Sequence, residues 1–321
     1  MSNITGKAVS QEQNFTEEAL KRLILDSAPE RVSEFNQLWE ECNVEIHSST
    51  DRPGFSLRAG PYGLVLFNHR TLCQIWLLGF AAQKASYTYS LALVQYQLQG
   101  TPFSKELLRH DAEFPNLVSE CNRLLSDILI LNGVESFEDF HWPDDIPRPA
   151  EGKPSDLDGS LTFDLLCMAG AYFFLHELRH VLLQNENANL NEHDEEMECD
   201  RYAREFLLSK IEEYSEQSGY DIDKLKTKRA MSIALASLLQ LVITPRDRWI
   251  DSPSHPSVIE RIKALADYLE LPENDFFWVY LSSLLLAQIE QHDINLESQL
   301  IRSQKSYCYE LLKTLDKSSD N

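Results

Sequence analysis

The chain has 321 residues, of which 43% are hydrophobic and 10% aromatic, so it can bury one large core or two modest ones. Asp and Glu outnumber Lys and Arg by 51 to 29, which gives a formal net charge of −22 at pH 7. A surface this acidic repels nucleic-acid phosphates and anionic lipid, so the sequence disfavours nucleic acid and membrane surfaces as partners.

Six cysteines are scattered without a C-x-x-C pair, and the N-terminus lacks the apolar core of a signal peptide. Both features indicate reduced thiols in a cytoplasmic protein. Three apolar stretches, Ile75–Ala82, Leu165–Leu175 and Phe276–Ile289, fall short of the roughly 18 apolar residues that a membrane span requires. We therefore expect a soluble protein.

The N-terminal half is predicted to be helical with one β element. Thr16–Cys42 has helical spacing in two pieces, and Ser27–Glu30 has the pattern of a capping box that starts the second piece. Residues 55–68 predict a β-hairpin around a Gly/Pro turn, and 70–98 and 104–131 are again helical. The hairpin could present an edge strand to an extended peptide, or it could simply cover core.

The second half is predicted to be a helical core that follows a long loop. Residues 141–160 contain four prolines, two glycines and five acids, which is typical of a functional or mobile loop. We expect a mainly α (α+β) fold with one small β-hairpin or sheet. It consists of an N-terminal helical region (1–140), this loop, and a helical core (161–321), which together form one compact unit. Beyond Asp221 the chain should be helical to Leu315 except at 243–257.

The chemistry-bearing motif is H-E-x-x-H at His176–His180, which follows the apolar run Leu165–Phe174. On a helix, positions i and i+4 lie one above the other, so His176 and His180 project from one face. Two such imidazoles can bind one Zn²⁺ and leave positions open, and Glu177 beside them can act as general base on a water at the metal. The alternative is a core helix with two satisfied histidines, although burial of such groups is costly unless they are paired or bound to metal.

A third ligand is expected from the acidic helix that begins near Asn191. Glu196 is our choice because Asp200, four residues on, shares its face and can accept the free ring N–H of His176. His193 is the alternative third ligand.

Other residues of this acidic helix are less suitable as ligands. Glu195 and Glu198 are expected to point away from the Asp200 face. Cys199 is expected to pack against the metal helix rather than to bind. Without the upstream motif, all these acids could be only a solvated helix start.

A third group of candidate site residues lies between Ser254 and Ile262. Ser257 and Glu260 predict a capping box, which places His255 just before a helix and Arg261 one turn inside it. Either His255 or Arg261 could stabilise negative charge that develops on a carbonyl oxygen, or could bond the ligand carboxylates. A His-Pro pair is also an ordinary entry turn to a helix.

Together the H-E-x-x-H motif, E-x-x-C-D-x-x-A (Glu196–Ala203) and H-P-x-x-x-x-R-I (His255–Ile262) resemble the gluzincin zinc metallopeptidases. The set is similar to the soluble phage-exclusion Lit-type peptidases and, more distantly, to the membrane-bound HtpX-type. The resemblance implies a zincin-like helical fold with zinc held by His176, His180 and Glu196. It also implies that Glu177 is the base and that Asp200 is the hydrogen-bond partner of a histidine ligand.

The resemblance covers about Leu161–Leu271 and departs from the family in two respects. Cys199 stands where alanine is usual, and the spacing from His180 to Glu196 is short for the membrane-bound members.

A Lit-like protein would be a zinc endopeptidase of bacterial phage defence that cleaves the cytosolic protein elongation factor Tu. Glu196–Leu208 also resembles the ImmA/IrrE metallopeptidases, which cut repressors. The rival from another class is a non-catalytic helical interaction protein with structural zinc or none. In that case a closed site would add His193 or Cys199 to the ligands.

Overall fold

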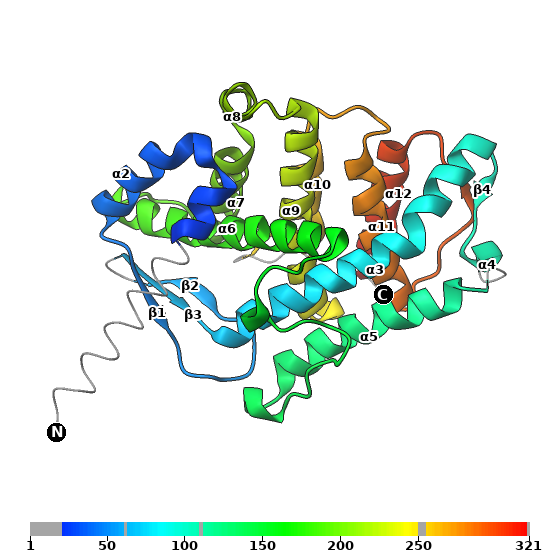
Figure 1. The fold of residues 1–321 in the computed structure, drawn as a ribbon, viewed down its shortest axis with the longest axis horizontal. Helices are drawn as coiled ribbons and strands as arrows, with labels where there is room; N and C mark the ends of the chain where they lie inside the picture. Colours follow the sequence, from blue (N-terminus) through cyan, green and yellow to red (C-terminus); the bar gives the residue numbers. More distant parts are fainter. Residues whose placement is uncertain (1–20, 61–62, 109–111, 250–254, 320–321) are drawn as a thin grey trace.

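The computed structural model describes residues 21–60, 63–108, 112–249 and 255–319. It confirms the predicted mainly helical fold with a small β component (Figure 1). The helices are α2 (Val32–Cys42), α3 (His69–Gln99), α4 (Lys105–Leu108), α5 (Phe114–Gly133), α6 (Leu157–Asn185), α7 (Glu192–Leu208), α8 (Ile211–Ser218), α9 (Ile222–Ile243), α10 (Val258–Tyr268), α11 (Phe276–Gln291) and α12 (Gln304–Ser319). The strands are β1 (Glu45–Ser48), β2 (Leu57–Ala59), β3 (Leu64–Phe67), β4 (Pro102–Phe103) and β5 (Gln299–Leu300).

Two long apolar helices, α3 and α6, form the centre of the core. α3 packs against α5, α6 and α11, whereas α6 packs against α7 and α9, so both halves of the chain share one hydrophobic cluster. Among the described residues α6 has the length and composition to cross a membrane, but 72% of its most apolar window is buried in the protein. That burial is what a central helix of a core requires.

The small sheet contains one strand beyond the predicted hairpin. The predicted hairpin is present as β2 antiparallel to β3, but β1 also pairs with β3, in parallel, giving the order β1-β3-β2. A second pair, β4 with β5, joins segments far apart in the chain. Such short strands lack the run of alternating residues that identifies a strand in a sequence, so they were missed. Strand β2 is an edge, and it packs against α6.

Three predicted boundaries were wrong. Ser27 does not cap a helix, because its hydroxyl donates to the Leu23 carbonyl, and a 3-10 turn at Pro29–Arg31 leads into α2 instead. The stretch 104–131 is divided into α4 and α5. The 141–160 loop ends early because the Asp156 carboxylate accepts the Gly159 N–H and starts α6 at Leu157. Residues 16–20 of the first predicted helix lie outside the described residues.

The tight contact between Gly79 of α3 and Leu166 of α6 leads to a prediction about stability. A Cβ added at Gly79 of α3 would lie 2.6 Å from the Leu166 side chain of α6, whereas one at Gly133, at the end of α5, would meet nothing within 4 Å. We expect Gly79→Ala to lower the free energy of unfolding by about 1–3 kcal/mol through overpacking, and Gly133→Ala to leave it unchanged or raise it slightly. Urea denaturation checks this; equal stabilities of the two variants would contradict the tight α3–α6 crossing.

Candidate metal centre

The two motif histidines face each other on α6, as their spacing predicted. The Nε2 atoms of His176 and His180 lie 3.3 Å apart, and His176 is buried. The Asp156 cap begins this helix and the apolar run anchors its middle in the core, so the last turns carry the imidazoles to the edge of a cleft.

Glu196 of α7 approaches both histidines, each with a different oxygen of its carboxylate. Asn191 caps α7 by accepting the Asp194 N–H, and Glu196 follows one turn later. Its Oε2 lies 3.4 Å from Nε2 of His176, and its Oε1 lies 3.5 Å from Nε2 of His180. Ligands about 2.1 Å from a tetrahedral zinc ion are about 3.4 Å from one another. The described donor set therefore fits a single zinc ion with one coordination position left open.

A carboxylate stands behind each histidine. Nδ1 of His176 lies 2.9 Å from Oδ1 of Asp200, and Nδ1 of His180 lies 2.7 Å from Oε1 of Glu195. These contacts direct both Nε2 atoms toward Glu196. The expected geometry of Asp200 is present, but the expectation that Glu195 points away was wrong. His180 is one turn further along α6 than His176, and the flexible Glu195 side chain reaches it from the position before Glu196.

Asp200 is also the anchor of a buried polar cluster. Tyr172 donates its hydroxyl to Oδ1 at 2.9 Å, and Arg261 of α10 donates through Nε and Nη2 to the two carboxylate oxygens. Burial disfavours the charged carboxylate, but the Arg261 guanidinium and the His176 hydrogen bond outweigh it and hold the pKa of Asp200 well below its usual range.

The pKa values of the two histidines shift upward, in the opposite direction to that of Asp200. Burial lowers an imidazole pKa, but the carboxylates around these rings more than compensate and raise the pKa of His176 and of His180 to about 9. At neutral pH the metal-free site thus favours protonated imidazoles among carboxylates, and metal binding must release these protons.

Glu177 lies beside the histidines and contacts the edge strand. The Ala59 N–H of β2 donates to Oε2 of Glu177 at 2.5 Å. Burial raises the pKa of Glu177, and the two nearby histidines only partly oppose the shift. Sequence reasoning could not find the Ala59 contact, because the two residues are 118 positions apart.

A cleft of about 420 Å³ gives access to this site, and its walls come from β2, α6, α7, α9 and the start of α10. Two hydrogen bonds join the ends of β2 to the β3 segment. The Ser56 carbonyl accepts from the Asn68 N–H, and the Gly60 N–H donates to the Leu64 carbonyl. Because bonding alternates along an antiparallel strand, the backbone groups of Leu57 and Ala59 face the open edge.

The remaining residues that the sequence predicted for the site lie in different parts of the structure. His255 is exposed and lines the cleft, whereas Arg261 is engaged with Asp200. Ser257 accepts from the Glu260 N–H and caps α10, as predicted. His193 lies near Asp194 and Glu260, with its closest ring nitrogens 3.8 and 4.0 Å from their oxygens.

Cys199 is an alternative to Glu196 as the third ligand. It is fully buried, and its sulfur and one ring nitrogen from each of His176 and His180 all lie within 4.8 Å of one another. The Glu196 oxygens lie 3.4 Å from Nε2 of His176 and 3.5 Å from Nε2 of His180. Burial also raises the pKa of the Cys199 thiol, which keeps it protonated in the metal-free protein.

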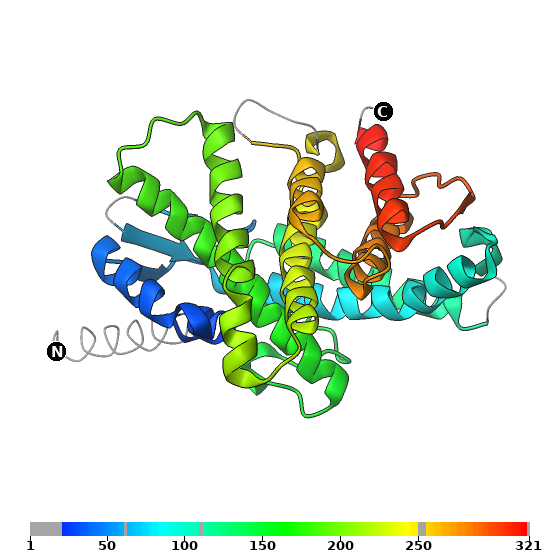
Figure 2. The same ribbon diagram turned by 90° about the horizontal axis from the view of Figure 1, so that it is seen from above.

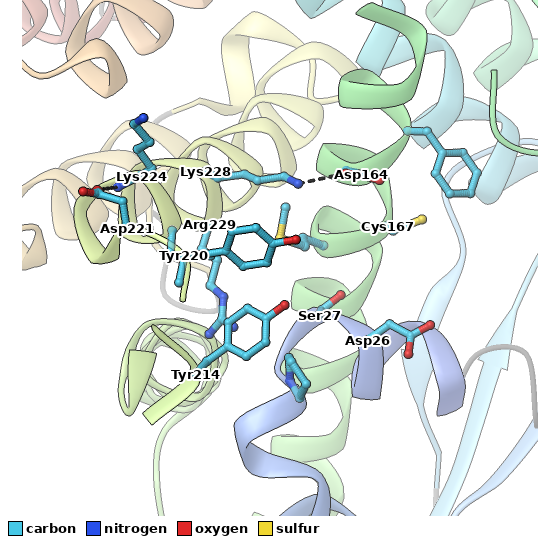
Figure 3. Close-up of a pocket in the computed structure, with 14 residues that line it drawn as sticks. Asp26, Ser27, Asp164, Cys167, Tyr214, Tyr220, Asp221, Lys224, Lys228 and Arg229 are labelled. Carbon is cyan, nitrogen blue, oxygen red and sulfur yellow. Dashed lines mark hydrogen bonds and ion pairs between the residues drawn. The ribbon is translucent and has the colours of Figure 1, made fainter. Parts of the chain in front are cut away.

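A larger cavity, of about 580 Å³, lies elsewhere along α6 (Figure 3). Its α6 wall includes Asp164 and Cys167, which by helical spacing are on the face opposite the histidines. Lys228 pairs with Asp164 at 2.8 Å, and the buried Arg229 pairs with Glu30. Because no histidine lines it, this cavity lacks the metal-binding chemistry of the cleft.

Similarity to a known family identifies the class of this protein. The family model described as Peptidase U49 matches residues 65–281, a span that contains the histidine pair, Glu196 and the His255–Ile262 segment. The chain belongs to the Peptidase U49 family and is a peptidase.

A relative of known activity also supports the assignment as a peptidase. The chain is 24% identical over 243 residues to the "Cell death peptidase" of Escherichia coli (strain K12), and the match covers 73% of this chain and 74% of the relative. No solved structure gives a significant match. These findings support the predicted resemblance to Lit-type peptidases. The gluzincin assignment and the HtpX-type relationship stay predictions.

Proposed function

We propose that this peptidase is a zinc-dependent endopeptidase of a cytosolic protein, with zinc held by His176, His180 and Glu196. One observation carries the proposal: the two histidine Nε2 atoms lie 3.3 Å from each other, and each lies 3.4 or 3.5 Å from one oxygen of the Glu196 carboxylate, close to the separation of ligands around a tetrahedral zinc ion. Family membership supports the peptidase reaction.

In the proposed mechanism Glu177 moves the proton. A zinc ion held by His176, His180 and Glu196 would act as a Lewis acid that polarises the scissile carbonyl and lowers the pKa of a water molecule. Glu177 Oε takes the proton from the attacking water and passes it to the nitrogen of the leaving amine. The raised pKa of Glu177 brings this carboxylate closer to the range in which it can accept and then release a proton.

The other polar residues orient this machinery. Asp200 and Glu195 keep the ring protons of the histidines on Nδ1, so that Nε2 is available as a ligand. Arg261 neutralises Asp200, which favours the role of positioning residue over direct contact with substrate. His255 faces the cleft and is the proposed donor to the carbonyl oxygen.

The substrate is proposed to bind along β2. Strand β2 is an edge beside Glu177, and an extended peptide can add to such an edge as a further strand. The outward backbone groups of Leu57 and the carbonyl of Ala59 are the proposed partners of this peptide, because the Ala59 N–H holds Glu177. The biological role that we propose is Lit-like: a cytoplasmic protein of bacterial phage defence that cleaves elongation factor Tu. Similarity to the cell death peptidase supports this role.

Exchange of the proposed base tests the mechanism. Glu177→Gln should keep about one zinc ion per chain and lose at least about 100-fold in cleavage rate, because the amide cannot accept the proton. His176→Ala should lose the metal and the activity together. Cleavage of elongation factor Tu in a bacterial extract, with a phage lysate added as trigger, is followed on gels, and zinc is measured by elemental analysis.

Glu198→Gln is the matched control for this experiment. Glu198 lies on α7 but pairs with Arg179 and Arg201, so its exchange should leave zinc content and cleavage unchanged. Undiminished cleavage by a zinc-replete Glu177→Gln protein would remove Glu177 from its proposed role. If zinc-replete wild type leaves elongation factor Tu intact but cuts another protein, the proposed substrate is wrong and the proposed reaction stands.

Glu195 gives a separate prediction, on metal affinity. Glu195→Ala should weaken zinc binding about 10- to 100-fold, because the His180 ring loses the partner that orients it. Glu192→Ala, one turn earlier on the exposed start of α7, should bind zinc like the wild type. Competition with a fluorescent chelator measures both constants. Equal affinities would show that the contact of Glu195 with His180 has no part in metal binding.

A further inference from the structure

The C-terminal half of α3 carries an exposed apolar stripe. Tyr87, Leu91, Val94 and Leu98 are spaced by four, three and four residues, so they lie on one face of the helix. All four are exposed, Leu91 by 68% and Leu98 by 81%. Isolated exposed apolar residues are normal in proteins, but a row of four on one helix face is not.

Two neighbouring helices extend this stripe into a broader surface. Leu157 and Leu161 are exposed on the first turns of α6, Leu157 by 84%, and Phe276 is exposed at the start of α11. Tyr87, Leu161 and Phe276 line one hollow of about 180 Å³. Figures 1 and 2 show the start of α6 beside α3, with the C-terminal half of α3 running along the outside of the molecule. We call these seven side chains the α3 surface.

The size and charge of the α3 surface set it apart from the rest of the chain. At about 200 Å² for a large side chain, the seven exposed fractions amount to an apolar area on the order of 800 Å². The largest patch on a typical monomer is about 300–600 Å², and a standard interface buries about 800 Å² per partner. Residues 85–99 include no charged residue, although the whole chain has a net charge of −22.

We propose that the α3 surface is a docking site for an amphipathic helix of a partner protein. A stripe with spacing of three and four residues matches the apolar face of a second helix laid along it. At the α6 end, the exposed carboxylates of Asp156 and Asp158 flank Leu157, so the partner helix carries a basic residue at that end. Two copies of a chain with net charge −22 repel each other, which favours a basic partner over self-association.

The docking site is separate from the proposed catalytic cleft. Leu161 and His176 are 15 residues apart on α6, which corresponds to about 22 Å along the helix. A bound helix would therefore leave the cleft open. The proposal does not depend on zinc or on peptidase activity.

A defined peptide tests the proposal. The probe is a fluorescein-labelled helix of about 18 residues, with leucines at positions i, i+4, i+7 and i+11 and lysines at one end. We expect it to bind the full chain in fluorescence anisotropy, and Leu91→Glu combined with Leu98→Glu to weaken binding at least about tenfold. Both substitutions are at exposed sites, so the fold should persist, which circular dichroism checks.

Controls distinguish this surface from non-specific apolar binding. Ile130→Glu, at an exposed apolar residue of α5, should bind the probe like the wild type, and a peptide with the same leucines scattered around the helix should not bind. Replacement of the probe lysines by glutamate should weaken binding, as should Asp158→Asn.

Three results would overturn the proposal. These are failure of the probe to bind, equal binding by the Leu91→Glu/Leu98→Glu variant, and a dimer in light scattering that Leu98→Glu dissociates. The last result would assign the surface to a second copy of the chain.

Discussion

The buried carboxylate of Asp200 is the contact on which the proposed metal centre depends. It accepts hydrogen bonds from Tyr172 and His176 of α6 and from Arg261 of α10, so one group on α7 ties three helices together. A charge this deeply buried is stable only with a complete set of partners, and loss of one partner typically costs about 3–5 kcal/mol. The cluster therefore fixes the spacing of α6 and α7, and with it the distance from Glu196 to the histidine pair.

Local periodicity explains what could be predicted from the sequence. Positions i and i+4 place His176 with His180 on α6 and Glu196 with Asp200 on α7, and the serine cap of α10 is encoded within four residues. Contacts between distant segments could not be predicted. The bond from Ala59 to Glu177 and the parallel pairing of β1 with β3 depend on how the segments pack.

Two further features show where periodicity is insufficient. Helical spacing predicts that Glu195 points away from the site, because it describes only Cβ positions. The long Glu195 side chain instead turns toward His180. The stripe on α3 has the same spacing as a face that is directed to the core, so only the structure shows that it is exposed.

The identity of the third ligand separates an open catalytic site from a closed structural one. With Glu196 as third ligand and Cys199 protonated, one position remains for water; with both bound, none does. X-ray absorption at the zinc edge of the purified, zinc-loaded protein distinguishes these directly. The proposed centre predicts nitrogen and oxygen ligands only, at about 2.0–2.1 Å, with imidazole scattering. A sulfur ligand at about 2.3 Å would place Cys199 on the metal and contradict the proposed site.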